Sequence, residues 1–308
     1  MRHRIISLLP SATEIVASLG CEDLLVGRSH ECDFPESVGQ LPVCCEPQID
    51  VSGSSHEIDK NVRSSLRDAL SIYRVLSEPL RRLAPTILIT QTQCDVCAVS
   101  LHDVENALGE LVESIPTVLA LAPMALVDIW DDILRVARVI GEEQRGTDLV
   151  ARLQRQLDEL GATVNKPKAR PTVACIEWID PLMTAGNWTP ELVKIAGGEP
   201  VLCESGKHSP WISWQDLRQA DADYIIVMPC GFSIERTKQE LTLLTTNPYW
   251  DQLSAVRHRR VFIADGNQYF NRPGPRVVES AQIIAEILDQ SDATALHQGG
   301  GWQPLSSG

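Results

Sequence analysis

An unbroken helical pattern over residues 124–165 most constrains what this chain can fold into. Apolar residues recur there at helical spacing and no strand signal interrupts them; they are Leu126, Ile129, Ile133, Leu134, Ala137 and Ile140. Gly141 or Gly146 would be the place of a break, and Pro167 and Pro171 end the pattern. We therefore expect a long connecting helix with a separate folding block on each side of it.

Both blocks alternate short strand signals with helical patterns. In the first block the expected strands are 4–9, 24–27, 86–90 and 117–121, and the expected helices are 10–20, 63–83 and 101–112. In the second block the expected strands are 172–179, 224–228 and 261–264, and the expected helices are 190–196, 234–244 and 275–288. Such alternation predicts an α/β fold: two α/β lobes, each with a mainly parallel sheet, joined by one long α-helix.

The pattern also predicts domain boundaries. Residues 1–123 form the N-terminal lobe, 124–165 the connecting helix and 166–290 the C-terminal lobe. We expect residues 291–308 to be a flexible tail, because they are polar and small and include three successive glycines.

The charge balance excludes some partners. The chain has 27 Lys and Arg against 41 Asp and Glu, a formal net charge of −14. An acidic chain is a poor partner for nucleic acid, and no apolar run is long enough for membrane insertion. Its start shows no secretory signal, which predicts a cytoplasmic protein, or a periplasmic one only if a native leader is missing.

Common enzyme signatures are missing from the sequence. It has no glycine-rich dinucleotide or phosphate loop, no His-Glu-x-x-His helix and no Gly-x-Ser-x-Gly elbow. We therefore predict a binding protein and not an enzyme.

Nine cysteines, an odd number, do not resemble a disulfide framework and favour a reducing compartment. Those in loops that follow strand signals are Cys32, Cys44, Cys45, Cys94 and Cys97. Ligands bind beyond the carboxyl ends of parallel strands, so these thiols and His30 are candidates for one site. Cys94 and Cys97 have the spacing of half a tetrahedral thiolate site, whose further ligands would come from Cys32, Cys44, Cys45 or His30. A redox dithiol and ordinary buried cysteines are the alternatives.

Aromatic side chains mark the second block. Trp178 ends an expected strand, Trp211 lies in a loop after His208, and Tyr269 and Phe270 precede the last expected helix. Aromatic faces in loops suit large flat ligands, so we expect these residues to contact one.

The stretches 4–14, 26–29, 200–211 and 271–276 resemble landmarks of the cobalamin-binding proteins of ATP-driven (ABC) importers, a group that also carries siderophores and haem. The likeness covers about residues 4–288. It implies two α/β lobes joined by a rigid helix, with a corrinoid held in the cleft between the lobes. The implied ligand contacts are His30, Glu31, Cys32, Trp178, Trp211, Tyr269 and Phe270, to which we add His208 as a candidate contact.

The resemblance also implies one glutamate per lobe for docking on the importer's permease. Glu78 fits in the first lobe, whereas Gln215, beside Asp216, stands at the matching position of the second. The chain further resembles a cysteine-rich subgroup without a signal.

Two functions from different classes follow. The first is a binding protein for a cobalamin-like corrinoid or a related metal tetrapyrrole, with His30, His208 or a cysteine as an axial ligand to the metal. The second is a protein with a zinc or iron site, or an iron–sulfur cluster, built from Cys32, Cys94, Cys97 and a further ligand, with a sensing or redox role.

Overall fold

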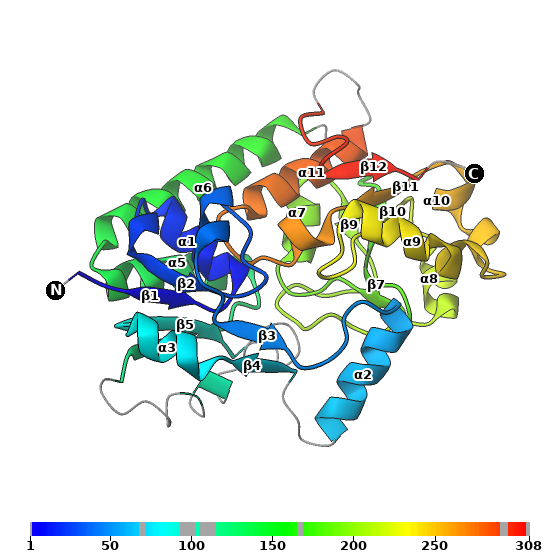
Figure 1. The fold of residues 1–308 in the computed structure, drawn as a ribbon. Coiled ribbons are helices and arrows are strands. Elements are labelled where there is room, and N and C mark those ends of the chain that lie inside the picture. The colour runs from blue at the N-terminus through cyan, green and yellow to red at the C-terminus, as the bar shows by residue number, and fades with distance from the viewer. Residues whose placement is uncertain are drawn as a thin grey trace. The chain divides into compact units, whose positions relative to one another are not determined.

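The computed structural model describes residues 2–67, 72–92, 103–104, 107, 115–164, 169–289 and 295–305. The chain divides into two compact units (Figure 1). Unit 1 comprises Met1–Gly53, Glu57–Pro123 and Val127–Arg152, and unit 2 comprises Ser54–His56, Met124–Leu126 and Leu153–Gly308.

The helical pattern of residues 124–165 forms two successive helices, α5 (Leu126–Ile140) and α6 (Glu143–Thr163). The break falls at Gly141, where φ is +79°, a left-handed conformation that glycine adopts without strain. The amide of Glu142 donates to the carbonyl of Ala137 at 2.8 Å, and Gly141 donates to Arg138 at 3.2 Å. This pair of bonds is a Schellman ending, which satisfies the last carbonyls of α5. Helix α6 begins in unit 1 and ends in unit 2.

Unit 1 contains a parallel sheet in the order β2-β1-β5-β6. Its strands are β1 (Ile5–Ser7), β2 (Leu25–Arg28), β5 (Ile87–Gln91) and β6 (Thr117–Leu121), so all four strands expected from the sequence are present. Helix α1 (Pro10–Ser18) follows β1. Buried side chains such as Ile6, Leu8 and Leu88 form the core of this unit.

The single helix expected over residues 63–83 is wrong. The described chain there forms α2 (Ser55–Arg67), strand β4 (Tyr73–Val75) and α3 (Ser77–Leu83). Strand β4 pairs antiparallel with β3 (Cys45–Pro47). Tyr73 and Val75 are buried while Arg74 between them is exposed, an alternation too short to stand out in the sequence.

Unit 2 contains a six-stranded sheet in which β12, β11, β10, β7 and β8 are neighbours in that order and β9 pairs with β7. Strands β7 (Thr172–Trp178), β10 (Tyr224–Val227) and β11 (Val261–Ala264) run parallel, as expected. The unpredicted strands are β8 (Met183–Thr184), β9 (Glu199–Pro200) and β12 (Trp302–Pro304). The helices are α7 (Thr189–Ile195), α8 (Trp214–Ala220), α9 (Ile234–Thr245), α10 (Ser254–Arg257) and α11 (Val277–Asp289).

The prediction of a flexible tail is wrong for residues 295–305, which include a strand. Strand β12 pairs antiparallel with β11, and Trp302 is buried against Phe262 with ring centres 5.6 Å apart. An edge strand of three residues offers too little pattern to be predicted, because its partner lies some forty residues earlier in the chain.

Candidate functional site

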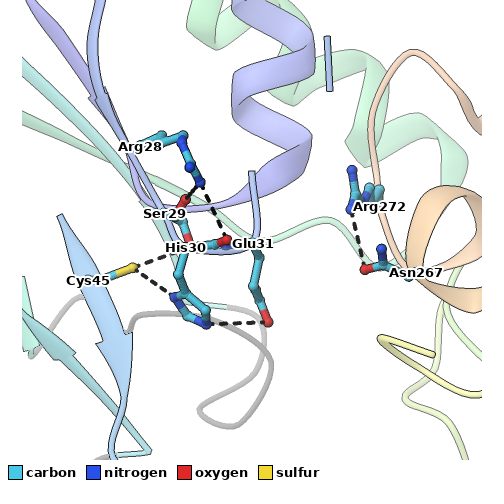
Figure 2. Close-up of polar contacts among 7 residues, drawn as sticks. All are labelled: Arg28, Ser29, His30, Glu31, Cys45, Asn267 and Arg272. Atoms are coloured by element: carbon cyan, nitrogen blue, oxygen red, sulfur yellow. Dashed lines mark hydrogen bonds and ion pairs between the residues drawn. The ribbon is translucent and has the colours of Figure 1, made fainter. Parts of the chain in front are cut away.

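In unit 1 the loop that carries His30 and Glu31 leaves the sheet at the carboxyl end of β2 (Figure 2). The guanidinium of Arg28, the last residue of that strand, donates to the carbonyls of Ser29 at 3.0 Å and Cys32 at 3.1 Å. Both bonds hold the loop in a tight turn. Parallel strands end at one edge of a sheet, so this loop lies where α/β proteins bind ligands.

The His30 imidazole makes a polar contact at each ring nitrogen. Its Nδ1 lies 3.5 Å from the Cys45 sulfur, and its Nε2 lies 3.9 Å from a carboxylate oxygen of Glu31 (Figure 2). The ring also packs 5.6 Å from the Tyr73 ring. Burial lowers the pKa of His30, because an imidazolium would lose its hydration there. We therefore expect a neutral imidazole whose two nitrogens are oriented by Cys45 and Glu31.

Cys45, one of the thiols that the sequence grouped with His30, lies beside it in the structure. Its thiol donates to the Ser29 hydroxyl at 3.3 Å, and burial raises the pKa of Cys45. The Cys32 side chain is 1% exposed and accepts a hydrogen bond from Thr13 at 3.0 Å. The structure thus places the Cys32 sulfur in the interior of unit 1 and not at the surface where a ligand contact was expected. Its predicted role beside Cys94 and Cys97 in a metal site stays a prediction, because those two residues lie outside the described residues.

The structure describes only part of the expected thiol cluster. Cys44 is buried, and Cys94 and Cys97 lie outside the described residues. In the part of the chain that the structure describes, no group of three or more His, Cys, Asp or Glu side chains could hold a metal ion.

Buried thiols make the stability of unit 1 sensitive to alkaline pH. Burial raises the pKa of Cys32 from 9.0 to about 12. Above pH 9 the unfolded chain would release this proton while the folded chain keeps it, so stability falls between about pH 9 and 12. The free energy of unfolding should drop between pH 8 and pH 10 in the parent protein, and in Cys32→Ala this drop should be smaller by about 1 kcal/mol. Urea unfolding at both pH values measures this, and an identical loss in the two proteins would contradict it.

In unit 2 an aromatic and cationic stack lies where β7 and β10 end. The Trp178 ring lies 5.3 Å from the Phe232 ring, and the Arg236 guanidinium lies 4.3 Å from the centre of the Phe232 ring. The Trp178 Nε1 is buried and has no hydrogen-bond acceptor among the described residues. A buried donor without an acceptor is costly, so this position calls for an explanation.

The loop with His208 and Trp211 is anchored at the same end of β7. The Ser209 hydroxyl donates to the Glu177 carboxylate at 2.8 Å and accepts from the amide of Gly186 at 3.0 Å. On this support His208 is exposed, and Trp211 presents 53% of its surface. An exposed tryptophan in an ordered loop provides a flat apolar face for a ligand.

The segment with Tyr269 and Phe270 forms a π-helical turn, Gly266–Phe270, after β11. Asp265 caps this turn by accepting from the amides of Asn267 at 2.9 Å and Gln268 at 2.7 Å. Tyr269 stays half-buried, whereas Phe270 is 1% exposed. The prediction that Phe270 packs on a ligand is therefore wrong, because the turn directs it into the protein interior.

The residues that the sequence argument missed follow the same strands. Phe232 lies between β10 and α9, and Arg236 lies in the first turn of α9. Arg272 donates to Asn267 at 3.3 Å (Figure 2), and Arg276 lies 5.2 Å from the Tyr269 ring. Their position after the ends of strands could have marked them as candidate site residues. The side chains that they contact, however, could not be predicted, because those contacts depend on how the turn folds.

The comparisons with known proteins agree with this architecture. Residues 5–267 match the family model described as periplasmic binding protein. The chain belongs to the periplasmic binding protein family. Its members bind solutes and are not enzymes, so the predictions of a binding protein and of two-lobed α/β architecture are confirmed.

Several relatives of this periplasmic binding protein are named for the ligand they bind. The vitamin B12-binding protein of Vibrio vulnificus is 22% identical, over 92% of this chain and 89% of the relative. The solved vitamin B12 binding protein of Vibrio cholerae is 20% identical, with a TM-score of 0.62, and covers 95% of this chain and 98% of its own. The solved haem binding protein of Pseudomonas aeruginosa is 18% identical, with a TM-score of 0.70, and covers 100% and 96%. At these identities the solved structures show the fold.

The residues expected to dock a transporter are at the surface of this periplasmic binding protein. Glu78 is exposed in the first turn of α3, and Gln215 is exposed in the first turn of α8. Asp216 beside it accepts from the amide and the hydroxyl of Ser213, at 2.8 and 2.6 Å, and these bonds lower the pKa of Asp216. Its carboxylate therefore caps α8. No helix within the described residues has the length and apolar character of a membrane span.

Proposed function

We propose that this periplasmic binding protein binds a corrinoid or a related metal tetrapyrrole. Trp211, more than half exposed on an anchored loop at the carboxyl end of the unit 2 sheet, is the observation that carries the proposal. Burial of one tryptophan face under a flat ring contributes about 2 kcal/mol of binding free energy. The buried Nε1 of Trp178 adds a donor without an acceptor at the same sheet edge.

His30 is the proposed axial ligand from unit 1. A neutral imidazole binds cobalt and iron, and a ligating histidine usually has its other nitrogen held by a second group. With Nδ1 beside Cys45 orienting the ring, Nε2 would supply the lone pair for the metal of the ligand, and the Glu31 carboxylate, 3.9 Å from Nε2, would move aside. The exposed His208 of unit 2 is the alternative axial ligand.

The names of the relatives support this class of ligand. Vitamin B12 and haem are both flat macrocycles that carry a metal, and the two solved relatives named for them share this fold. An ABC importer permease is the proposed partner, with Glu78 supplying a charged contact and Gln215 a neutral one. That partner belongs to the alternative in which this protein works in the periplasm. The free cysteines of the described residues support the other alternative, a binding protein in a reducing compartment such as the cytoplasm that does not dock on a permease. Fractionation of host cells tests that location.

A second candidate function is a metal or iron–sulfur site with a sensing or redox role. The observation in its favour is the 3.5 Å separation of the Cys45 sulfur from His30 Nδ1. With ordinary zinc–sulfur and zinc–nitrogen distances, that separation corresponds to an angle at the metal of about 107°, close to tetrahedral. In this candidate Cys45 replaces Cys32 as a ligand, and the loop after β5 would add Cys94 and Cys97.

One experiment tests both candidates. Protein purified anaerobically from its own host is analysed for metal and by visible absorption, and is then titrated with haemin and with hydroxocobalamin. We expect saturable 1:1 binding with a shift of the absorption bands, and His30→Ala should abolish the shift while the exposed surface variant His258→Ala keeps it. Absence of binding to both probes would contradict the tetrapyrrole proposal. One zinc or iron per chain that is lost in Cys45→Ser and kept in Cys21→Ser supports the second candidate.

A further inference from the structure

The carboxylate of Glu286 gathers residues 295–305, the C-terminal segment, onto helix α11. It accepts four hydrogen bonds from that segment: from the amides of Leu296 at 3.1 Å and His297 at 3.2 Å, from His297 Nδ1 at 2.7 Å and from Trp302 Nε1 at 2.7 Å. The side chains of Glu286 and His297 are 12% and 14% exposed. A largely buried carboxylate with this many donors is a strong local anchor, because each bond has a charged acceptor.

The anchored segment supports the turn that carries Tyr269. Trp302 pairs with Ala264 at the end of β11, and the amide of Asp265 donates to the carbonyl of Gly301 at 2.9 Å. Asp265 is the residue that caps the Gly266–Phe270 turn. The C-terminal segment thus holds the backbone at the point where this turn begins.

A side-chain contact supports the same turn further along. The His297 ring packs edge-on against the Tyr269 ring, with centres 6.1 Å apart, and the Arg276 guanidinium also lies against Tyr269. Tyr269 therefore has its ring oriented by the C-terminal segment and by Arg276, the residue directly before α11. A ligand contact that is already ordered binds more tightly, because little conformational entropy is lost on binding.

We propose that the C-terminal segment is a brace that positions the ligand-binding loop of residues 265–272, with Glu286 and His297 as its positioning residues. This inference rests on the proposed function, in which Tyr269 contacts the ligand. Neither Glu286 nor His297 is itself proposed to touch the ligand. Their effect on binding would pass through the order of the loop.

The test combines affinity with amide hydrogen exchange on the full chain. We expect Glu286→Ala to weaken binding of haemin or hydroxocobalamin roughly tenfold and to accelerate exchange in residues 265–272 as well as in 295–305. Gln282→Ala, one turn earlier on α11, is the matched control and should change neither measurement.

A second pair of variants keeps the Glu286 carboxylate and separates the ring contact from the hydrogen bond. His297→Phe retains a ring against Tyr269 and should bind within about twofold of the parent protein, whereas His297→Ala should lose affinity roughly fivefold. Parent-like affinity and parent-like exchange of residues 265–272 in both alanine variants would overturn the brace. Exchange is read without ligand. If the parent protein binds neither probe while both alanine variants accelerate exchange in 265–272, the proposed function fails and the brace stands.

Discussion

Trp211→Ala should weaken binding of haemin or hydroxocobalamin about 30-fold and leave the melting temperature unchanged within about 2 °C. The expected loss is that of one aromatic contact face, about 2 kcal/mol. The fold should tolerate the change because 53% of the Trp211 surface is already in solvent. Equilibrium absorbance titration and thermal unfolding of the same samples measure the two effects.

Trp211→Phe is the matched control for this prediction. It retains an aromatic face on the loop anchored by Ser209 and Glu177, so most of the affinity should remain. A Trp211→Ala protein that binds either probe as tightly as its parent would remove the observation on which the proposed pocket rests.

Phe270→Ala should have the opposite profile, a large loss of stability. Phe270 is among the largest fully buried side chains of the described chain, and truncation of such a residue leaves a cavity. We expect a loss of about 3–5 kcal/mol in the free energy of unfolding. Urea unfolding followed by circular dichroism measures this loss.

Phe270→Leu fills most of the same volume and should cost less than half as much. If Phe270→Ala were instead as stable as the parent protein but bound the probes weakly, the side chain would contact the ligand, as its place in the sequence first indicated. Tyr269 and Phe270 would then both contact the ligand.

The buried central strands were predictable from sequence because they are covered on both faces. Strands β5 (Ile87–Gln91) and β10 (Tyr224–Val227) are continuous runs of buried residues, which stand out against the helices around them. The short strands β4 and β12 were missed because they lack such a run. Three residues carry almost no periodicity, and each of these strands is stabilised by a partner distant in the chain.

The location of the candidate site was also predictable, whereas the direction of its side chains was not. Ligand contacts were expected at the carboxyl ends of β2, β7 and β11; His30 and Tyr269 follow β2 and β11, and Trp178 is the last residue of β7. Neighbours one or two residues away diverge, however. Cys32 turns to Thr13 and Phe270 enters the interior, because the conformation of each turn sets which side chain points where.

By itself the sequence determined the two α/β units, the helical connection with a break at Gly141 or Gly146, and the resemblance to binding proteins; the structure placed the break at Gly141. These features follow from local periodicity, glycine conformation and motif residues. Only the tertiary structure decided that Cys45 contacts His30 and that Glu286 binds the C-terminal segment. Such contacts join residues from different elements, and the pairing of those elements depends on packing that no local pattern encodes.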